Sequence, residues 1–372
     1  MHEERVLQLQ ETLERKNLDA ALVIHHLNVY YFNSSAQLGA LFVPRDGEAV
    51  YYVIRDYERA KEESVFECVK VSGFGEVLSK VKGKRIGADL SLVNGTITRR
   101  LRELRPEDIA EDILRIRMVK NREEIELIKK AVEMCCEVLE KVPEILKENM
   151  REFELAARLE YELKMLGHDG YLEGRSAEYL PNVVAISSGS AKPGRFAAVT
   201  AGVGMSSACP VGSGRKKIKR GDVVWIDIGG RVEGYSSDVT RCFAVGRADE
   251  RVCEVYERLK ELYKKSLKVI KAGASVKDVF EFAFNLAAEL EILDGFMGRK
   301  EKMKFVGHGI GLNVDEYPII GPFNEELKEN VVVAFEPKIV LEDYTGIGIE
   351  SDVVVSDRAK VLDKAAVDLV EC

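Results

Sequence analysis

Residues 223–243 have the sequence VVWIDIGGRVEGYSSDVTRCF, and the interpretation of the whole chain starts from this stretch. Apolar residues flank a turn rich in glycine, so the pattern predicts a β-hairpin. Asp227 lies on its first strand and Asp238 on the returning strand. Because side chains alternate along a strand, Asp227 is expected on the same face as Val223 and Trp225. The hairpin therefore carries carboxylates into apolar surroundings.

Two carboxylates in such surroundings repel each other and need a neutralising partner. Burying charged groups is costly unless they are paired. A hard divalent cation with carboxylate ligands is the simplest neutraliser. Acid pairs in hairpins also occur as solvated turn residues, so Asp227 and Asp238 by themselves leave both interpretations open. Further candidate ligands elsewhere in the chain are needed to decide.

Three such candidates occur nearer the C-terminus. His308 lies between two glycines, where the backbone can approach a ligand closely. Glu336 ends the apolar stretch VVVAF, and Glu350 lies within GIGIESDVVV, so both acids belong to stretches expected to be buried strands. Four carboxylates formally balance two divalent cations, and the imidazole adds a neutral ligand. Two ions about 3.5–4 Å apart could generate a nucleophile from water near neutral pH.

Length, net charge and cysteine usage limit the classes of protein to which this chain can belong. A chain of 372 residues is expected to form two domains. The formal net charge of −8 argues against nucleic acid as the main partner. No apolar run reaches membrane-spanning length, and the charged N-terminal residues 1–16 predict an amphipathic helix and not a signal peptide. The seven cysteines form no Cys-x-x-Cys pair and fit reduced thiols, so a cytoplasmic location is expected.

The N-terminal third alternates strand and helix patterns, which predicts a small α/β domain. A boundary is expected between residues 106 and 120, giving domains 1–118 and 119–372. The expected strands are 20–24, 41–43, 49–54, 68–71 and 85–88, and the expected helices beyond the first are 55–63, 76–81 and 97–104. His25 and His26 are expected in a loop, and Asn28, Tyr30 and Tyr31 are candidates to line a pocket facing another subunit.

The remaining two thirds alternate helix pairs with strands. The expected helices are 122–146 with a break at Pro143, 153–167, 252–267 and 275–288, and the expected strands outside the first hairpin are 182–187, 331–336 and 347–355. Ser275 and Asp278 predict a capping box. The aperiodic stretch 191–214 is expected to be a loop that borders the site. Because a helix pair followed by strands with two acids occurs twice, two related halves are expected.

The motifs IDIGGRVEGYSSDVTRCF, GHGIGL, AFEP and IESDVVV together resemble those of the pita-bread metallopeptidases, which include Xaa-Pro aminopeptidases, prolidases and methionine aminopeptidases. The resemblance covers about residues 120–372, and the N-terminal domain followed by RIRMVKNREEIELIKKA resembles the creatinase/prolidase branch. It implies an α+β fold, with a small α/β domain followed by a pita-bread catalytic domain that has pseudo-twofold halves.

The resemblance also implies a role for each candidate ligand. Asp227 would chelate one metal ion, Asp238 and Glu350 would bridge two ions, and His308 and Glu336 would hold the other. Glu336 would also be the general base. Manganese or cobalt is expected, and iron or zinc also fits oxygen-rich ligation. The implied activity is hydrolysis of Xaa-Pro peptide bonds by a hydroxide shared between the two ions, in an aminopeptidase or dipeptidase that forms a homodimer.

Several positions depart from the family pattern. Asp315 occupies the place of a second histidine, and Gly348 the place of an arginine. Residues 208–211 lack the histidine that the family often has before the first Asp strand. Asp315 is interpreted either as a donor or cation ligand for substrate or as a loop cap. His168 is interpreted either as a loop residue or as a substitute proton donor.

These departures motivate two alternatives to an Xaa-Pro peptidase. One is a metal-dependent lyase or amidohydrolase on the same fold. The other is a pseudoenzyme that serves as a binding module, which predicts that metal ligands are missing.

Overall fold

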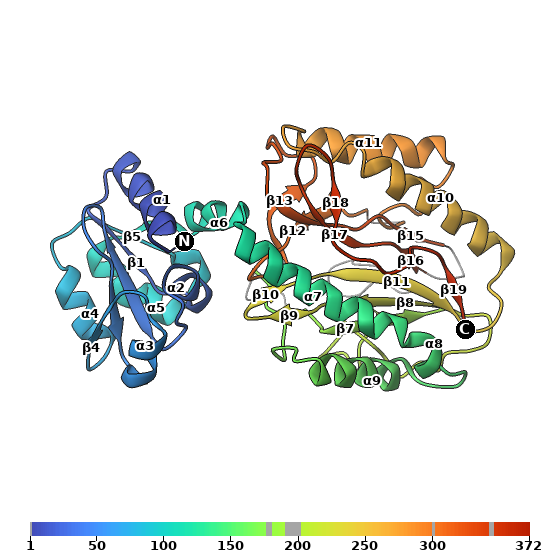
Figure 1. The fold of residues 1–372 in the computed structure, drawn as a ribbon, viewed down its shortest axis with the longest axis horizontal. Coiled ribbons are helices and arrows are strands. Elements are labelled where there is room, and N and C mark those ends of the chain that lie inside the picture. The colour runs from blue at the N-terminus through green and yellow to red at the C-terminus, as the bar shows by residue number, and fades with distance from the viewer. Residues whose placement is uncertain (1, 176–180, 190–201, 300–301, 342–345) are drawn as a thin grey trace. The chain divides into compact units, whose positions relative to one another are not determined.

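The computed structural model describes residues 2–175, 181–189, 202–299, 302–341 and 346–372 (Figure 1). The chain divides into two compact units, Met1–Arg117 and Met118–Cys372, named below the N-terminal unit and the C-terminal unit. Residues 191–201 of the predicted loop 191–214 lie outside the described residues. Within the described part of the chain, no helix combines the length and apolarity that crossing a membrane requires.

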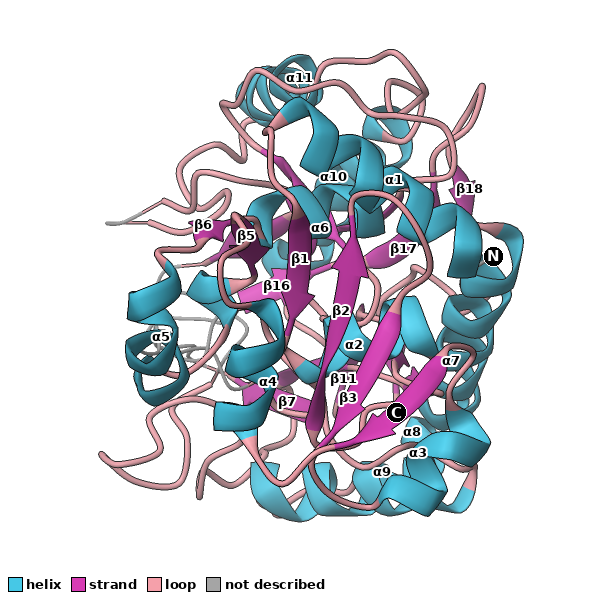
Figure 2. Cartoon of the chain, turned by 90° about the vertical axis from the view of Figure 1, so that its left-hand side faces the viewer, coloured by secondary structure: helices cyan, strands magenta, loops and turns pink. Residues whose placement is uncertain are grey.

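The N-terminal unit contains a six-stranded sheet with the strand order β4-β3-β2-β1-β5-β6. Figure 2 shows β1, β2 and β3 side by side, in register as antiparallel neighbours. The pairs β3–β4, β1–β5 and β5–β6 are parallel. The strands are β1 (Ala20–Val23), β2 (Gly39–Pro44), β3 (Val50–Val53), β4 (Glu67–Lys70), β5 (Ile86–Ala88) and β6 (Glu107–Asp108). The first five match the predicted strands, and β6 was not predicted.

The helices of this part of the chain are α1 (His2–Arg15), α2 (His26–Asn33), α3 (Tyr57–Glu63), α4 (Phe74–Val81), α5 (Gly95–Leu101) and α6 (Ala110–Met118), with short 3₁₀ turns at Leu90–Leu92 and Arg102–Leu104. The predicted loop is confirmed at His25, which precedes α2, but is wrong at His26, which begins this helix. The pocket interpretation of Asn28 and Tyr31 is also wrong, since both side chains are buried inside the unit.

Helix α2 is capped by a residue distant in sequence. Its N-cap His25 makes no side-chain capping bond. Instead, the buried carboxylate of Asp89 accepts hydrogen bonds from the backbone amides of Ile24 at 2.9 Å and His25 at 3.0 Å. It also accepts one from Asn28 Nδ2 at 2.9 Å. An acid at a helix N-terminus satisfies free amides and complements the helix dipole, so Asp89 fixes where α2 begins.

The C-terminal unit contains two larger sheets, with the orders β19-β11-β8-β7 and β13-β12-β14-β17-β18. The first is built from β7 (Val184–Ser188), β8 (Val223–Ile228), β11 (Val239–Ala244) and β19 (Val370–Glu371). The second is built from β12 (Gly307–Gly309), β13 (Glu316–Ile320), β14 (Val332–Phe335), β17 (Ser351–Val354) and β18 (Lys360–Val361). Two short ladders join β9 (Arg231–Val232) to β10 (Tyr235–Ser236) and β15 (Lys338–Val340) to β16 (Gly346–Gly348).

Helices cover these sheets in two groups. The first group is α7 (Arg122–Glu140), α8 (Val142–Ile145) and α9 (Glu152–Met165), and the second is α10 (Glu250–Ser266) and α11 (Val276–Glu289). Figure 1 shows α10 and α11 on one side of the strands and α9 on the other. The helices of each group contribute buried residues to a separate hydrophobic core. This arrangement agrees with the predicted α+β class and its two related halves.

Two local predictions in this unit are corrected. The predicted strand 347–355 is two short strands, β16 and β17, separated at Glu350. Glu350 instead forms an isolated antiparallel bridge with Thr240. Ser275 is the N-cap of α11, but its side chain makes no capping bond, so the predicted capping box is absent.

Strand β8 separates the two cores. Val224, Ile226 and Ile228 lie in the core shared with α7 and α9. Val223 and Trp225 lie in the core shared with α10 and α11, as their alternation predicted. Asp227 continues this second row, so the strand directs its carboxylate toward the region between the two sheets.

Candidate metal centre

Five predicted ligands lie close together in the C-terminal unit and are named here the acid–histidine cluster: Asp227, Asp238, His308, Glu336 and Glu350. In the β8–β11 pair, Asp227 lies directly opposite Thr240, and Asp238 immediately precedes β11. The bridge of Thr240 to Glu350 ties this sheet to the second one, with backbone N–O distances of 3.3 and 3.2 Å.

The second sheet supplies His308 and Glu336. His308 is the middle residue of β12 and pairs with Ala334 of β14, while Glu336 follows the end of β14. His308 Nε2 lies 3.7 Å from Glu336 Oε1 and 3.9 Å from Asp238 Oδ2. One ligand atom from each of Asp238, His308 and Glu350 lies within 4.8 Å of the others. Sheet pairing therefore brings the ligands together from positions far apart in the sequence.

The carboxyl groups of the cluster lie in a strongly unfavourable environment for negative charge. Burial raises the pKa of Asp238 well above its ordinary value, and the charges of Glu350 and Asp227 raise it further. Burial also raises the pKa of Glu350 well above its ordinary value, with Glu336 and Asp227 adding to the shift. The cluster therefore favours either bound protons or a bound cation.

Lys338 is a member of the site that the sequence reasoning missed. Its side chain is 5% exposed, and its Nζ donates a hydrogen bond to Glu336 Oε2. Burial opposes the charge, but Glu336 and Glu350 outweigh it and raise the pKa of Lys338. Residues two apart in an extended segment share a face, and Glu336 and Lys338 have this spacing. That alternation is the signal that could have found it.

Two further supporting residues have the same spacing from a cluster acid. Thr240, two residues after Asp238, donates a hydrogen bond from Oγ1 to Glu350 Oε2 at 2.8 Å. Asp352, two residues after Glu350, accepts a hydrogen bond at Oδ2 from the Asp238 backbone amide at 3.1 Å. Such partners fix the orientation of carboxylates that bind a metal.

The two predicted substrate residues have different surroundings. Asp315 accepts a hydrogen bond at Oδ1 from the Arg175 backbone amide at 2.6 Å. Burial raises the pKa of Asp315, while the hydrogen bond from the Arg175 amide and the charge of His308 lower it. His168 Nδ1 accepts a hydrogen bond from the Gly170 amide at 2.8 Å. The structure does not bring His168 into the group of potential ligands.

Gly348, where an arginine was expected, lies directly opposite Lys338 in the β15–β16 ladder. A Cβ atom at Gly348 would approach Trp225 Cζ2 to 2.7 Å. A larger side chain at this position would therefore displace the buried indole. The positively charged side chain on this ladder is instead that of Lys338, on the paired strand β15.

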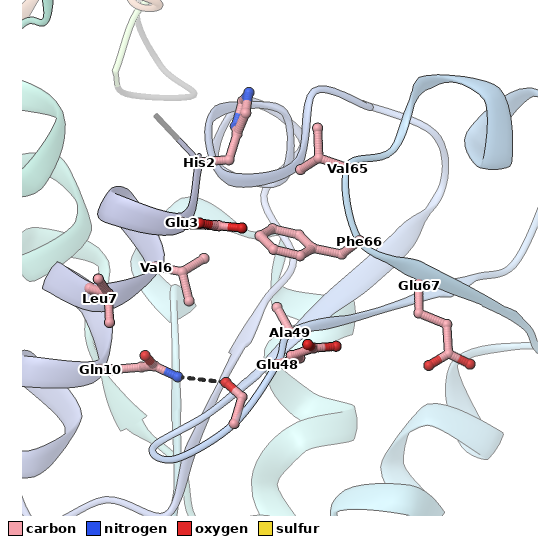
Figure 3. A pocket seen from close by; sticks show the side chains of 11 residues that line it. His2, Glu3, Val6, Leu7, Gln10, Glu48, Ala49, Val65, Phe66 and Glu67 are labelled. Atoms are coloured by element: carbon pink, nitrogen blue, oxygen red, sulfur yellow. Dashed lines mark hydrogen bonds between the residues drawn. The ribbon is translucent and has the colours of Figure 1, made fainter.

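A cavity of about 610 Å³ lies in the N-terminal unit, between α1, the turn after β2 and the segment before β4 (Figure 3). Its lining includes Val6, Phe66, Glu3 and Glu67. Gln10 Nε2 donates a hydrogen bond to the Gly47 carbonyl at 2.9 Å across its lower edge. None of the lining residues belongs to the acid–histidine cluster, so this cavity is not part of the candidate metal centre.

Comparison with known families agrees with both units. Residues 126–357 match metallopeptidase family M24, and residues 5–119 match the creatinase/prolidase N-terminal domain. The chain belongs to metallopeptidase family M24. The resemblance drawn from the motifs is thereby confirmed.

Individual M24 relatives are similar over almost their whole length. The chain is 31% identical over 379 residues to a Xaa-Pro dipeptidase of Pyrococcus furiosus, with 99% of each chain covered. The prolidase structure from Pyrococcus horikoshii OT3 is 30% identical, with a TM-score of 0.83 and coverage of 99% of this chain and 100% of that chain. The X-Pro aminopeptidase structure from Thermotoga maritima MSB8 is 26% identical, with a TM-score of 0.80 and 99% of each chain covered.

Membership in M24 implies a divalent metal, and the acid–histidine cluster fits one. Asp238, His308 and Glu350 offer two carboxylates and an imidazole within a single coordination sphere. Hard and borderline divalent ions favour this donor set. Burial and neighbouring acids raise the pKa values of Asp238 and Glu350, and a bound cation would relieve this unfavourable accumulation of negative charge.

Proposed function

We propose that this M24 enzyme hydrolyses Xaa-Pro peptide bonds, as a dipeptidase or an aminopeptidase. The observation that carries the proposal is the convergence of Asp238, His308 and Glu350 between the two sheets, in a chain of this family. Relatives named Xaa-Pro dipeptidase, at 31% and 30% identity, match 99% of the chain and favour the dipeptidase form. The substrate would be a short peptide.

Glu336 is the proposed general base. Its Oε2 is held by Lys338, and its Oε1 faces His308 at 3.7 Å. One oxygen is thus oriented by a hydrogen bond while the other can accept a proton from the attacking water. A bound divalent ion would polarise the scissile carbonyl and lower the pKa of a bound water, so that this water can react near neutral pH.

The edge of the cluster is slightly exposed whereas its interior is buried. The side chains of Asp238 and His308 are 14% and 11% exposed, and that of Glu336 is 6% exposed. Substrate can therefore reach the ligands at the edge. The low-dielectric interior strengthens the interaction of the acids with a cation. Thr240 keeps the Glu350 carboxylate in place for this role.

The nature of the ion, the assembly and the location belong to the same proposal. The oxygen-rich donor set supports manganese or cobalt, while iron or zinc would also be accepted. The expected homodimer and cytoplasmic location stay predictions. A lyase, an amidohydrolase or a binding module is not favoured, because full-length similarity is to Xaa-Pro peptidases and all five predicted ligands are present in the sequence.

The proposal is tested with purified protein loaded with manganese or cobalt. Substrates are Xaa-Pro dipeptides, longer peptides that begin with Xaa-Pro, and matched dipeptides with alanine in place of proline. We expect metal-dependent cleavage of the Xaa-Pro peptides, abolished by EDTA and restored by the ion. The ratio of dipeptide to longer-peptide cleavage separates a dipeptidase from an aminopeptidase. Bound metal without cleavage of any Xaa-Pro peptide would contradict the proposed function.

A further inference from the structure

Arg175 is anchored at two points to the segment that leads into β13. Its backbone amide donates a hydrogen bond to Asp315 Oδ1 at 2.6 Å. Its guanidinium lies over the ring of Tyr317, with Arg175 Cζ 4.4 Å from the ring centroid. Stacking of the planar guanidinium on an aromatic ring orients its N–H donors. The position of this cation is therefore set by residues 315–317.

These residues lie beside one ligand of the acid–histidine cluster. In the β12–β13 pair, His308 is opposite Ile319. The next residue, Gly309, is opposite Glu316 instead, so residues 317–318 form a bulge at the step that follows His308. A Cβ atom at Gly309 would collide with the backbone carbonyl of residue 317. The tyrosine beneath the guanidinium is therefore packed directly against the residue after a predicted metal ligand.

The start of the same segment contacts the hairpin of the other sheet. The backbone amide of Ser236 donates a hydrogen bond to the Gly311 carbonyl at 2.7 Å. Ser236 is two residues before Asp238 in the sequence. Residues 311–317 are thus held between the neighbours of two cluster ligands. Because Arg175 is anchored to this segment, its guanidinium lies next to the candidate metal centre.

The guanidinium of Arg175 has an unused donor. Its Nη1 is buried and has no hydrogen-bond partner among the described residues. A guanidinium carries five N–H donors in a fixed fork, which matches the two oxygens of a carboxylate. A buried charged donor without an acceptor is unfavourable. An anionic ligand group would satisfy it.

A substrate of the proposed reaction carries such a group at a defined place. In an Xaa-Pro dipeptide the proline ends in a free carboxylate, one residue beyond the scissile bond, whereas a longer peptide has an amide there. Lys338 is already bonded to Glu336, and Gly348 offers no side chain where an arginine was expected. Arg175 is a cation next to the centre whose donor is still unpaired.

We propose that Arg175 binds the free α-carboxylate of an Xaa-Pro dipeptide and thereby makes the enzyme a dipeptidase. This inference rests on the proposed Xaa-Pro peptidase function and names the substrate end that the site recognises. Arg175 is then a specificity residue, which contacts the carboxylate of proline and not the scissile bond. Its loss should raise KM for the dipeptide more than it lowers kcat.

The test compares Ala-Pro with its C-terminal amide, using full-length protein loaded with manganese. In Arg175→Met, which removes the charge at similar side-chain length, the ratio of kcat/KM for Ala-Pro to that for the amide should fall about 10- to 100-fold. Arg175→Lys keeps the charge but not the fork, so its ratio should be intermediate. Arg158→Met, at an exposed position of α9, is the matched control and should leave the ratio unchanged. An equal ratio in wild type and Arg175→Met would overturn the inference.

A binding measurement separates this inference from the proposed function. Calorimetric titration of the same proteins with free proline and with prolinamide requires no turnover. Wild type should bind proline more tightly than prolinamide, and Arg175→Met should lose this preference. Equal affinities of wild type for the two ligands, or a preference that Arg175→Met retains, would contradict the carboxylate site. A preference for proline that depends on Arg175, in a protein that cleaves no Xaa-Pro peptide, would contradict the proposed function and support the carboxylate site.

Discussion

Asp89 in the N-terminal unit and Asp238 in the C-terminal unit are both carboxylic acids shielded from solvent. The neighbours of Asp89 lower its pKa, whereas those of Asp238 raise it. Burial raises the pKa of each. Hydrogen bonds from Asn28 and from the amides of Ile24 and His25 oppose that shift at Asp89. At Asp238 the nearest charges are other acids, among them Glu350, and they increase the shift.

This difference separates a structural acid from a ligand. Asp89 has its charge solvated by donors that the fold provides, so it needs no ion. The acid–histidine cluster lacks enough donors, and Asp352 Oδ1, just behind Asp238, is buried without a hydrogen-bond partner among the described residues. Hydrogen-bond donors of the fold stabilise the first acid, whereas the second group favours bound protons or a bound cation.

The largest effect is expected when one acid of the cluster is neutralised, which tests the difference between the two kinds of buried acid. Glu336→Gln keeps the shape of the side chain but removes the proton acceptor. We expect the turnover of Xaa-Pro peptide to fall about 10²- to 10⁴-fold while the protein stays folded. Steady-state kinetics at saturating metal measures this. Glu133→Gln, at an exposed helical position, is the matched control. A wild-type rate in Glu336→Gln would eliminate Glu336 as the base.

The equivalent change in the N-terminal unit should affect stability and not metal binding. Asp89→Ala removes the acceptor of three hydrogen bonds, and each buried donor left unpaired costs about 1–3 kcal/mol. We expect a loss of about 3 kcal/mol in urea denaturation, with manganese stoichiometry unchanged. Asp46→Ala, whose side chain is 90% exposed, should change stability by less than about 0.5 kcal/mol. Unchanged stability of the Asp89→Ala protein would show that Asp89 has no structural role.

A subtler change tests the support given to one ligand. Thr240→Val deletes the hydroxyl that donates to Glu350 Oε2, at nearly constant volume. Metal affinity should fall about 10- to 100-fold, as for other partners of metal ligands. Calorimetric titration with manganese measures the change, and Thr240→Ser should recover most of it. Equal affinities in wild type and Thr240→Val would show that the hydroxyl does not orient the carboxylate.

The smallest expected effect is on pH dependence. The folded pKa values of Asp238 and Glu350 lie above their unfolded values, so the ion-free folded state binds more protons. Stability in EDTA should therefore fall as pH rises above about 4, through the raised pKa values, by about 1.4 kcal/mol for each pKa unit. Manganese should reduce this slope. Thermal melts between pH 5 and 8 test it, and Asp238→Asn should show a smaller slope in EDTA. A steeper slope with manganese than without would contradict the cation requirement.

Local patterns predicted most of the fold because most elements are specified by nearby residues. The hairpin of β8 and β11 follows from its alternation and glycines. Helix α2 could not be predicted, because its cap is Asp89, more than 60 residues away in the chain. The break between β16 and β17 also depends on a distant partner, since Glu350 pairs with Thr240 of the other sheet.

The candidate site was predicted only in part, because some of its contacts also join residues that are distant in sequence. Acids in apolar strands are unusual in a sequence, so the five ligands could be proposed from the chain alone. Lys338, Thr240 and Asp352 are ordinary residues when considered singly, and only the pairing of strands shows what they contact. Their common spacing of two residues from an acid was present in the sequence but has no meaning until the strand faces are known.

The most direct test of the account is anomalous diffraction from crystals grown with manganese. We predict strong manganese density within coordination distance of Asp238, His308 and Glu350. Crystals without a manganese peak in this cluster, or with its acids turned apart toward solvent, would contradict the claim that buried carboxylates gather here to bind a divalent ion.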